Sequence, residues 1–186
     1  EITMYRNDVI GIGLGGNEEA FPAEWFSDVF IEAKRRGFHT VAHAGEAVGA
    51  NSIWSALKYL QAERIGHGVR AIEDPVLLNY LKEKQTPLEI CITSNLKLKV
   101  LSSLAIHPVR KLFDKGILIT INSDDPTMFG SDLNDEFLLL FDEYNFTIPE
   151  IQQLTKNAIT ASFADEPLKT QLRLIHEEFW NKTNYC

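Results

Sequence analysis

The amino-acid sequence predicts an α/β fold, a (β/α)8 TIM-type barrel of which this chain supplies about the last five β/α units plus carboxyl-terminal helices. Three observations lead to this prediction. Apolar, strand-like stretches recur at intervals of about 25–30 residues, and helical patterns fill the gaps between them. Polar residues follow several of these stretches directly. The stretches are residues 9–15, 39–44, 64–68, 88–93 and 117–123.

The predicted helices between the strands begin and end at recognisable signals. Pro22 suits the first position of a helix, and Gly37 suits the exit, because glycine readily adopts the left-handed conformation that ends many helices. We expect the second helix over about residues 52–62, and the third and fourth to begin at the X-Pro pairs 74–75 and 107–108. Beyond the fifth strand we expect helices over roughly residues 133–145, 149–164 and 166–181.

The spread of polar residues favours a barrel over a doubly wound sheet. Catalytic groups of a barrel come from many strand ends at one face, whereas a doubly wound sheet concentrates its site at one switch point. A complete barrel needs eight units and about 250 residues. We therefore expect residues 1–186 to form a single domain, the carboxyl-terminal part of a barrel without its first strands. The chain begins at Glu1 rather than at Met, so we expect it to be processed, clipped or cut from something longer.

Composition and charge argue against several classes of partner. The chain carries 18 basic and 26 acidic residues, a net charge of -8, and has no Lys/Arg-rich block. Nucleic acids and anionic membrane surfaces are therefore poor partners. No apolar run reaches the length of a membrane span, and nothing resembles a signal peptide. The two cysteines, Cys91 and Cys186, indicate no disulfide framework, so we expect a cytoplasmic protein.

The stretch around which the candidate site is organised runs from Thr40 to Glu46. An apolar, β-branched run stops at His43, and only small residues separate it from Glu46. This pattern is typical of a strand that ends at the mouth of a site. A neutral imidazole there can ligate a divalent metal, and a nearby carboxylate can transfer protons. The alternative is a hydrogen-bonded structural histidine.

Glycines at 11, 13 and 16 satisfy the G-x-G-x-x-G pattern of a dinucleotide site. That site requires the last glycine to open a helix whose amino terminus meets the pyrophosphate. Here residues 17–21, which include two acidic ones, separate Gly16 from Pro22. We therefore prefer a close-packed strand end that brings backbone near a ligand.

Two further strand ends carry candidate residues. His67 lies between glycines after the third strand, where it is either a functional group or a structural residue of a tight turn. Asp124 and Asp125 follow the fifth strand, and they would repel each other unless a cation or hydrogen-bond donors separate their tasks. The alternative is that this pair caps the following helix.

Together these strand ends supply imidazoles and carboxylates of the kind used in metal-assisted hydrolysis. In such a site His and Asp ligate the metal, while a Glu and a His move protons around a bound water. His39, His107 and His176 lie away from these strand ends, and we assign them no chemistry. We expect Cys91 to be a core residue, because the pattern provides no general base for a thiolate.

The same residues resemble the motifs of a known family, the adenosine/adenine deaminases of the metal-dependent amidohydrolase superfamily. The loop at residues 15–18 resembles the family's Gly-acid loop, with Asn17 in place of a commoner Asp. Residues 91–95 and 162–163 also fit, so the resemblance covers nearly the whole chain. The motifs that carry it, in this order and spacing, are HAGE at 43–46, RIGHG at 64–68 and SDDP at 123–126.

The resemblance implies zinc-dependent hydrolytic deamination of a 6-aminopurine by attack of a metal-bound hydroxide on C6. His43 and Asp124 would be ligands of Zn2+. Glu46 would pass a proton to the purine N1, and His67 would orient the attacking hydroxide. Zinc lowers the pKa of a bound water towards about 7, and burial holds a glutamate partly protonated, so the chemistry agrees with these roles.

The resemblance also implies a small-molecule purine substrate and a place in purine nucleotide metabolism. Asp125 would bind N7 of the purine, and the Gly16 backbone would meet N3. Adenosine to inosine is the reaction we expect. Adenine, or another aminopurine nucleoside such as aminodeoxyfutalosine, remains an alternative, because the family contacts the ribose largely through its amino-terminal half.

One departure from the family pattern is serious. The family takes two more zinc ligands from a His-x-His pair on the first barrel strand, and no histidine precedes His39 in this sequence. Two protein ligands are too few for a catalytic zinc, which usually has three or more. We therefore expect the isolated chain to be inactive and to need the missing amino-terminal half as its partner. The alternative class is an inactive fragment or a purine-binding half-barrel.

Overall fold

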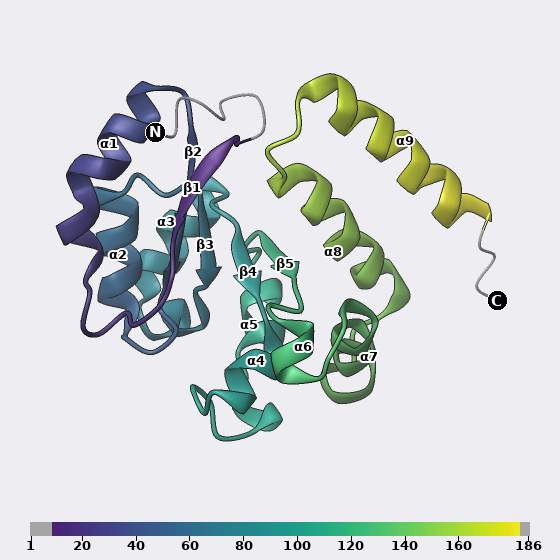
Figure 1. Cartoon of the computed structure of the whole chain (residues 1–186). Helices are drawn as coiled ribbons and strands as arrows, with labels where there is room; N and C mark the ends of the chain where they lie inside the picture. The colour runs from purple at the N-terminus through teal and green to yellow at the C-terminus, as the bar shows by residue number, and fades with distance from the viewer. Residues whose placement is uncertain (1–8, 183–186) are drawn as a thin grey trace.

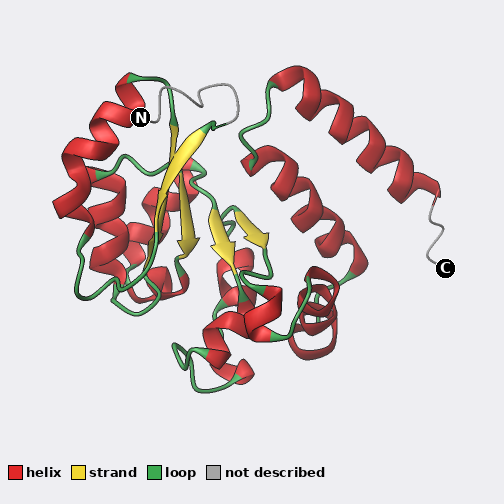
Figure 2. Ribbon diagram, viewed as in Figure 1, coloured by secondary structure: helices red, strands yellow, loops and turns green. Residues whose placement is uncertain are grey.

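The computed structural model describes residues 9–182. Within this range five parallel strands form one sheet in which every strand pairs with its neighbours in sequence, in the order β1-β2-β3-β4-β5. The parallel register and the helices between strands confirm the predicted α/β architecture, whose strands and helices are shown in Figures 1 and 2. The strands are β1 (Gly11–Leu14), β2 (His39–Ala44), β3 (Arg64–His67), β4 (Leu88–Ile90) and β5 (Ile119–Ile121).

Helices connect the strands and continue beyond the last one. The long carboxyl-terminal helix α9 lies outside α8, which in turn packs against β5 (Figure 1). Between the strands lie η2 (Ala23–Phe26), α1 (Ser27–Arg35), α2 (Ala50–Tyr59), η3 (Val69–Glu73), α3 (Pro75–Lys84), α4 (Ile92–Lys97), η4 (Leu104–Ile106) and α5 (Val109–Asp114). After β5 come α6 (Pro126–Phe129), α7 (Leu133–Tyr144), α8 (Ile148–Ala161) and α9 (Glu166–Lys182).

Local signals account for most helix starts. Asp74 caps α3 by accepting hydrogen bonds from two backbone N–H groups of the first turn, and Pro75 occupies the first helical position. Asp132 and Asp135 form a capping box at α7, and Thr147 and Glu150 form one at α8. The first helix differs from the prediction, because Pro22 leads into the 3₁₀ turn η2 and the α-helix begins only at Ser27.

The end of the fourth strand corrects the sequence prediction. We expected a strand over residues 88–93, but β4 ends at Ile90 and α4 begins at Ile92. The cause is the carboxylate of Glu136, fully buried on α7, which accepts hydrogen bonds from the N–H groups of Ile92 and Thr93. A carboxylate at a helix amino terminus satisfies donors that would otherwise be unpaired. This cap comes from a residue more than forty positions away, so the local sequence carries no sign of it.

A continuous apolar core joins the sheet to the helices around it. Its fully buried members include Ile65 on β3, Leu88 on β4, Ile119 on β5 and Leu140 on α7. On the β5 side, Asn157 of α8 donates a hydrogen bond to the Ile119 carbonyl at 3.0 Å, which fixes the helix against the strand backbone. Within residues 9–182, no helix combines the length and apolar character that a membrane crossing requires.

An arginine clamp holds the start of α8 against α5. Arg110 donates hydrogen bonds to Asp114 on its own helix and to Glu150 of α8, the latter at 2.8 Å. Its guanidinium lies 4.9 Å from the ring centroid of Phe113 and 4.2 Å from that of Phe146. Arg110 and the backbone N–H of residue 147 together lower the pKa of Glu150 to about 2, Arg110 being the larger cause. The clamp therefore contributes stability only while Glu150 is ionised.

We expect Glu150→Gln to lower the free energy of unfolding by about 0.5–1 kcal/mol at pH 7, after allowance for solvent screening. The folded-state pKa lies below the unfolded value of about 4.3, so the contribution is present above pH 5 and is lost as the pH falls towards 2. Urea denaturation of both proteins between pH 3 and pH 7 measures the difference. Glu178→Gln, in an exposed pair with Lys182, should change stability by less than about 0.5 kcal/mol at every pH. A pH-independent loss for Glu150→Gln would contradict the clamp.

Candidate active site

Predicted site residues from three different strand ends meet at one edge of the sheet. His43 lies near the end of β2, His67 ends β3, and Asp124 follows β5. All three line one cavity of about 370 Å³, which Cys91 also borders. Parallel strands present their carboxyl ends at the same edge, so residues distant in sequence are brought together there.

The register of β2 against β3 leaves room for the His43 ring. His43 pairs with Gly66, and a Cβ atom built on Gly66 would stand only 2.7 Å from the His43 ring. A Cβ atom built on Gly15, directly after β1, would lie 3.7 Å from the same ring. The His43 ring meets the His67 ring edge to face, with centroids 4.7 Å apart. The small residues on both neighbouring strands therefore position this imidazole at the rim.

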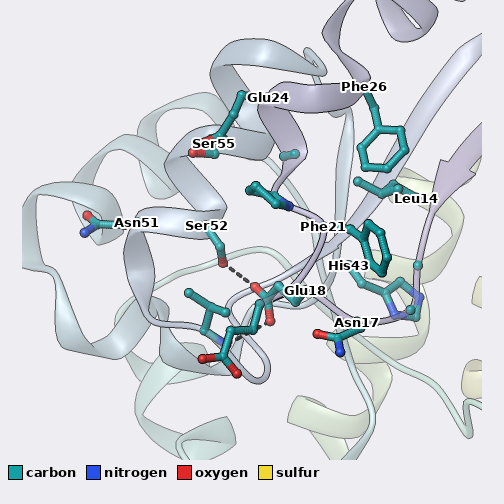
Figure 3. A pocket seen from close by; sticks show the side chains of 16 residues that line it. Leu14, Asn17, Glu18, Phe21, Glu24, Phe26, His43, Asn51, Ser52 and Ser55 are labelled. Carbon is teal, nitrogen blue, oxygen red and sulfur yellow. Dashed lines mark hydrogen bonds between the residues drawn. The ribbon is translucent and has the colours of Figure 1, made fainter.

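The loop that carries Glu46 is held by the side chain of Glu18. The Glu18 carboxylate accepts hydrogen bonds from the N–H groups of Gly45 at 2.5 Å, Glu46 at 3.2 Å, Ala47 at 2.8 Å and Val48 at 2.9 Å. It also pairs with the hydroxyl of Ser52, as Figure 3 shows. Successive N–H groups that converge in this way form an anion nest. The loop after β1 thus shapes the loop after β2.

Glu46 is largely enclosed beside two other carboxylates. Its side chain is 13% exposed, and its Oε2 atom lies 3.5 Å from Nε2 of His67. Burial raises its pKa to about 7, with contributions from the charges of Asp124 and Glu18, while a hydrogen bond from Asn95 opposes the rise. Among the described residues, its Oε1 atom is buried without a hydrogen-bond partner. A carboxyl group with these properties is half protonated near neutral pH, which suits a proton donor.

His67 is neutral and fixed on both sides. Burial, with the charge of His43 as second cause, lowers its pKa to about 4. Its Nδ1 atom lies 3.3 Å from Nδ2 of Asn95, and its Nε2 atom faces Glu46 at 3.5 Å and Asp124 at 4.0 Å. The backbone at His67 is left-handed, with φ of 61°. Such a conformation costs a non-glycine residue of order 1 kcal/mol or more and is concentrated at functional sites.

Asp124 is held in the same strained conformation. Its φ is 58°, and its Oδ2 atom accepts a hydrogen bond from the Ser94 hydroxyl at 2.7 Å. Its side chain is 28% exposed, so the carboxylate is partly open to solvent. Cys91, close by, is buried as expected of a core residue. Burial and surrounding carboxylates raise the pKa of its thiol far above the usual range.

The donor set fits a divalent metal of the zinc type. Among the described residues, ligand atoms of His43, Glu46 and His67 lie within 4.8 Å of one another, and so do those of His67, Cys91 and Asp124. Imidazole and carboxylate are zinc ligands, whereas the Cys91 thiol is held protonated and is a poor one. His43 and Asp124 open into the same cavity, each grouped with His67. The unpartnered Glu46 Oε1 leaves one further acceptor at the site.

The two predicted purine contacts occupy different surroundings. Asp125 caps α6, with Oδ1 accepting a hydrogen bond from the Met128 N–H at 2.9 Å. This is the helix-capping alternative, and it occupies one carboxylate oxygen. Gly16 has φ of 109°, a backbone conformation that L side chains rarely adopt.

Gly16 borders a cleft of about 510 Å³ beside His43. Leu14, Phe21 and Phe26 give the cleft apolar walls (Figure 3). Phe21, from the loop after β1, and His43, near the end of β2, face the same space in that view. No helix opens at Gly16, because the first helical turn, η2, begins at Ala23. This arrangement agrees with a strand end that approaches a ligand rather than with a dinucleotide fold.

The sequence prediction assigned no role to three residues that shape the site. Glu18 organises the Glu46 loop, and Asn95 and His107 form a buried hydrogen-bonded pair behind His67. The motif at 15–18 carried a signal for Glu18, but nothing in the local pattern distinguishes His107. His39 and His176 lie outside the site as expected: His39 stacks on Phe163 with centroids 4.0 Å apart, and His176 contacts Thr155.

A partial parallel barrel with imidazoles and carboxylates gathered at one rim defines an amidohydrolase-type protein. The family model described as "Adenosine deaminase" matches residues 1–177. The chain belongs to the adenosine deaminase family, which confirms the resemblance found in its motifs.

Relatives and solved structures agree with this assignment. Over 168 residues the chain is 44% identical to an adenine deaminase of Crocosphaera subtropica, covering 90% of this chain and 52% of the relative. It is 39% identical over 171 residues to an adenosine deaminase of Klebsiella pneumoniae, covering 92% and 51%. The chain therefore spans about half the length of the curated relatives it matches.

The fold matches experimental structures closely. An adenine deaminase of Arthrobacter aurescens superposes with a TM-score of 0.91 at 34% identity, covering 98% of this chain and 56% of that one. An amidohydrolase of Burkholderia ambifaria with bound zinc gives a TM-score of 0.91 at 28% identity, covering 97% and 51%. The match to about half of each neighbour confirms the prediction of a partial barrel.

We expect Gly66→Ala to disturb the site and Gly13→Ala to leave it intact. The added methyl at position 66 would overlap the His43 ring, so we expect a loss of about 1–3 kcal/mol in the free energy of unfolding. At position 13, on β1, the nearest atom to an added Cβ is 3.9 Å away, and we expect a change within about 0.5 kcal/mol. Chemical denaturation measures both, and NMR shifts of His43 report the ring displacement. Equal effects of the two substitutions would contradict the packing described.

Proposed function

We propose that this chain supplies the acid–base half of a zinc-dependent active site that hydrolytically deaminates a 6-aminopurine. The observation that carries the proposal is the pairing of Glu46 with His67, 3.5 Å apart at a rim shared with His43 and Asp124. The pKa of Glu46 is about 7, which suits a group that must give up a proton near neutral pH. Family membership supports the same reaction class.

His43 and Asp124 are the residues that would hold zinc. Both line the rim cavity, and both are ligand types that zinc accepts. When bound, zinc lowers the pKa of water and so makes hydroxide available near neutral pH. The zinc in the Burkholderia ambifaria neighbour supports the same metal here.

The remaining roles belong to the chain's own side chains. Glu46 delivers its proton to N1 of the purine, which lets the ring accept electrons as oxygen adds to C6. His67, buried next to Glu46, orients that oxygen. Asp125 contacts N7 through its carboxyl group, and the Gly16 backbone meets N3. Water enters and ammonia leaves, so the 6-amino group is replaced by oxygen.

The substrate is a 6-aminopurine as free base or nucleoside. The relatives include proteins named adenine deaminase and adenosine deaminase, at 44% and 39% identity. The apolar cleft of about 510 Å³ beside His43 has walls suited to a flat ring. Conversion of adenosine to inosine stays a prediction, and a panel of adenine, adenosine and aminodeoxyfutalosine decides among the substrates.

We also propose that residues 1–186 act as one domain within a longer or two-part barrel. The continuous sheet and the core cluster that joins it to the helices, both within residues 9–182, support this organisation. The missing half of the barrel would be the partner. It would lie against this chain and complete the metal site.

We expect the isolated chain to bind zinc weakly and to turn over no 6-aminopurine, because two protein ligands fall short of the usual three. Competition with a metal chelator measures affinity, and the ultraviolet difference between adenine and hypoxanthine measures turnover. His43→Ala should remove the residual binding, while His176→Ala, on α9, should preserve it. Tight stoichiometric zinc and full activity in the isolated chain would overturn the two-ligand proposal.

Complementation tests the function itself. We expect activity when the chain is co-expressed with the amino-terminal half of the Crocosphaera subtropica relative. In that assembly Glu46→Gln should lower kcat by about 100-fold or more while zinc is retained, because the proton donor is lost. Glu83→Gln, exposed on α3, is the matched control and should retain activity. An assembly that binds zinc yet converts no member of the substrate panel would refute the proposed function.

A further inference from the structure

Three buried hydrogen bonds link the backbone of α5 to the centre of the site through the side chains of His107, Asn95 and His67, and together they form a relay. The Val109 N–H donates to Nδ1 of His107 at 3.2 Å. Nε2 of His107 lies 3.3 Å from Oδ1 of Asn95, and Nδ2 of Asn95 lies 3.3 Å from Nδ1 of His67. The three side chains are 4%, 0% and 2% exposed, so solvent does not compete for these contacts.

The backbone N–H of Val109, at one end of these hydrogen bonds, determines which nitrogen of each imidazole carries a proton. A backbone N–H can only donate, so Nδ1 of His107 must accept and carries no proton. The pKa of His107 is lowered by burial to about 4, which keeps the ring neutral. A neutral ring with a bare Nδ1 holds its proton on Nε2, and this N–H therefore donates to the atom of Asn95 that faces it.

The amide of Asn95 accepts a hydrogen bond on one side and donates one on the other, so it fixes the direction of the hydrogen bond to His67. The atom that accepts from His107 must be the carbonyl oxygen, so the atom that faces His67 is the NH2 group. The NH2 group donates to Nδ1 of His67, which must then be bare. With Nδ1 bare, the imidazole proton of His67 is left on Nε2, the nitrogen that faces Glu46 and Asp124.

We propose that His107 and Asn95 are positioning residues that lock His67 in the Nε2–H tautomer. Locked in this way, His67 presents a hydrogen-bond donor to the rim of the site and cannot serve there as a proton acceptor. The consequence for catalysis rests on the proposed function. His67 would orient the attacking oxygen by donating a hydrogen bond to it, while Glu46 would carry out the proton transfer. Neither His107 nor Asn95 touches the substrate in this scheme.

Nitrogen-15 NMR tests the tautomers directly, on the metal-free chain and without any activity measurement. The chain has five histidines, so two-bond nitrogen–proton spectra of a histidine-labelled sample resolve each ring. In the wild-type protein we expect His67 and His107 each to show a bare Nδ1 and a protonated Nε2. A protonated Nδ1 on either ring would overturn the proposal, whatever the outcome of the deaminase assays.

Substitutions distinguish the effect of these hydrogen bonds on the His67 tautomer from an effect of side-chain packing. Asn95→Asp replaces the NH2 donor by an acceptor oxygen, so we expect His67 to switch to the Nδ1–H tautomer. His107→Leu removes the donor to Asn95, and we expect His67 to become a mixture of tautomers. Tyr144→Phe is the matched control: Tyr144 packs 6.1 Å from the His107 ring, and its hydroxyl donates to the Leu104 carbonyl instead.

Folded Asn95→Asp or His107→Leu protein with an unchanged His67 tautomer would refute the relay, and so would a shift in Tyr144→Phe. Should both relay variants fail to fold, the wild-type spectrum still decides, because it must show two bare Nδ1 atoms. A correct tautomer pattern combined with failed complementation would leave the relay intact and refute only the proposed function.

Discussion

The pairing of His43 with Gly66 across β2 and β3 is the constraint on which the site depends. In a parallel ladder a slip of one residue turns every side chain to the opposite face, so the register decides which residues reach the rim. In this register the absence of a side chain at Gly66 gives the His43 ring its space. The next pair places Ala44 beside His67, and the two imidazoles meet edge to face. The strand register alone thus determines where the two imidazoles lie, independently of their polar contacts.

The Glu18 carboxylate, bound by backbone N–H groups of the Glu46 loop, adds a negative charge close to this part of the site. A carboxylate that accepts several backbone N–H bonds is strongly held, and each charge-assisted bond contributes about 1.5–3 kcal/mol. The same negative charge lies near Glu46, and together with burial and Asp124 it raises the pKa of Glu46. The Glu18 side chain therefore both shapes the loop and contributes to the raised pKa of Glu46 on it. Removing Glu18 would disturb both properties at once.

The strand starts and the residues at the strand ends were predictable because short-range chemistry determines them. Apolar runs, X-Pro pairs and capping residues act within a few positions, and β2 has the expected bounds from His39 to Ala44. The candidates His43, Glu46, His67 and Asp124 likewise stood out because polar residues interrupted apolar runs. The structure places His43, His67 and Asp124 around one cavity and Glu46 beside His67, whereas their chemical roles stay predictions.

Contacts that span many residues were not predictable from the local pattern. The Glu136 cap on α4, the Glu18 nest and the His107 relay each join segments that lie at least twelve positions apart. In a single sequence His107 looks like the start of a helix, and its contact with Asn95 of α4 spans twelve positions. Because His107 and Asn95 are buried, each polar atom needs a hydrogen-bond partner within the protein, and this requirement determines the tautomer of His67.

The site divides into a buried part and an open part, and the division follows from the energetics of each task. The proton donor of the proposed mechanism needs a raised pKa, which burial among fixed carboxylates provides, and residues of this chain enclose Glu46 and His67. A metal ligand needs space for the ion and for its other ligands. His43 is exposed and Asp124 is 28% exposed, so both present their ligand atoms to the open side of the rim. In the proposed function the chain would therefore supply its own means of tuning proton transfer, and the metal would take further ligands from outside this set.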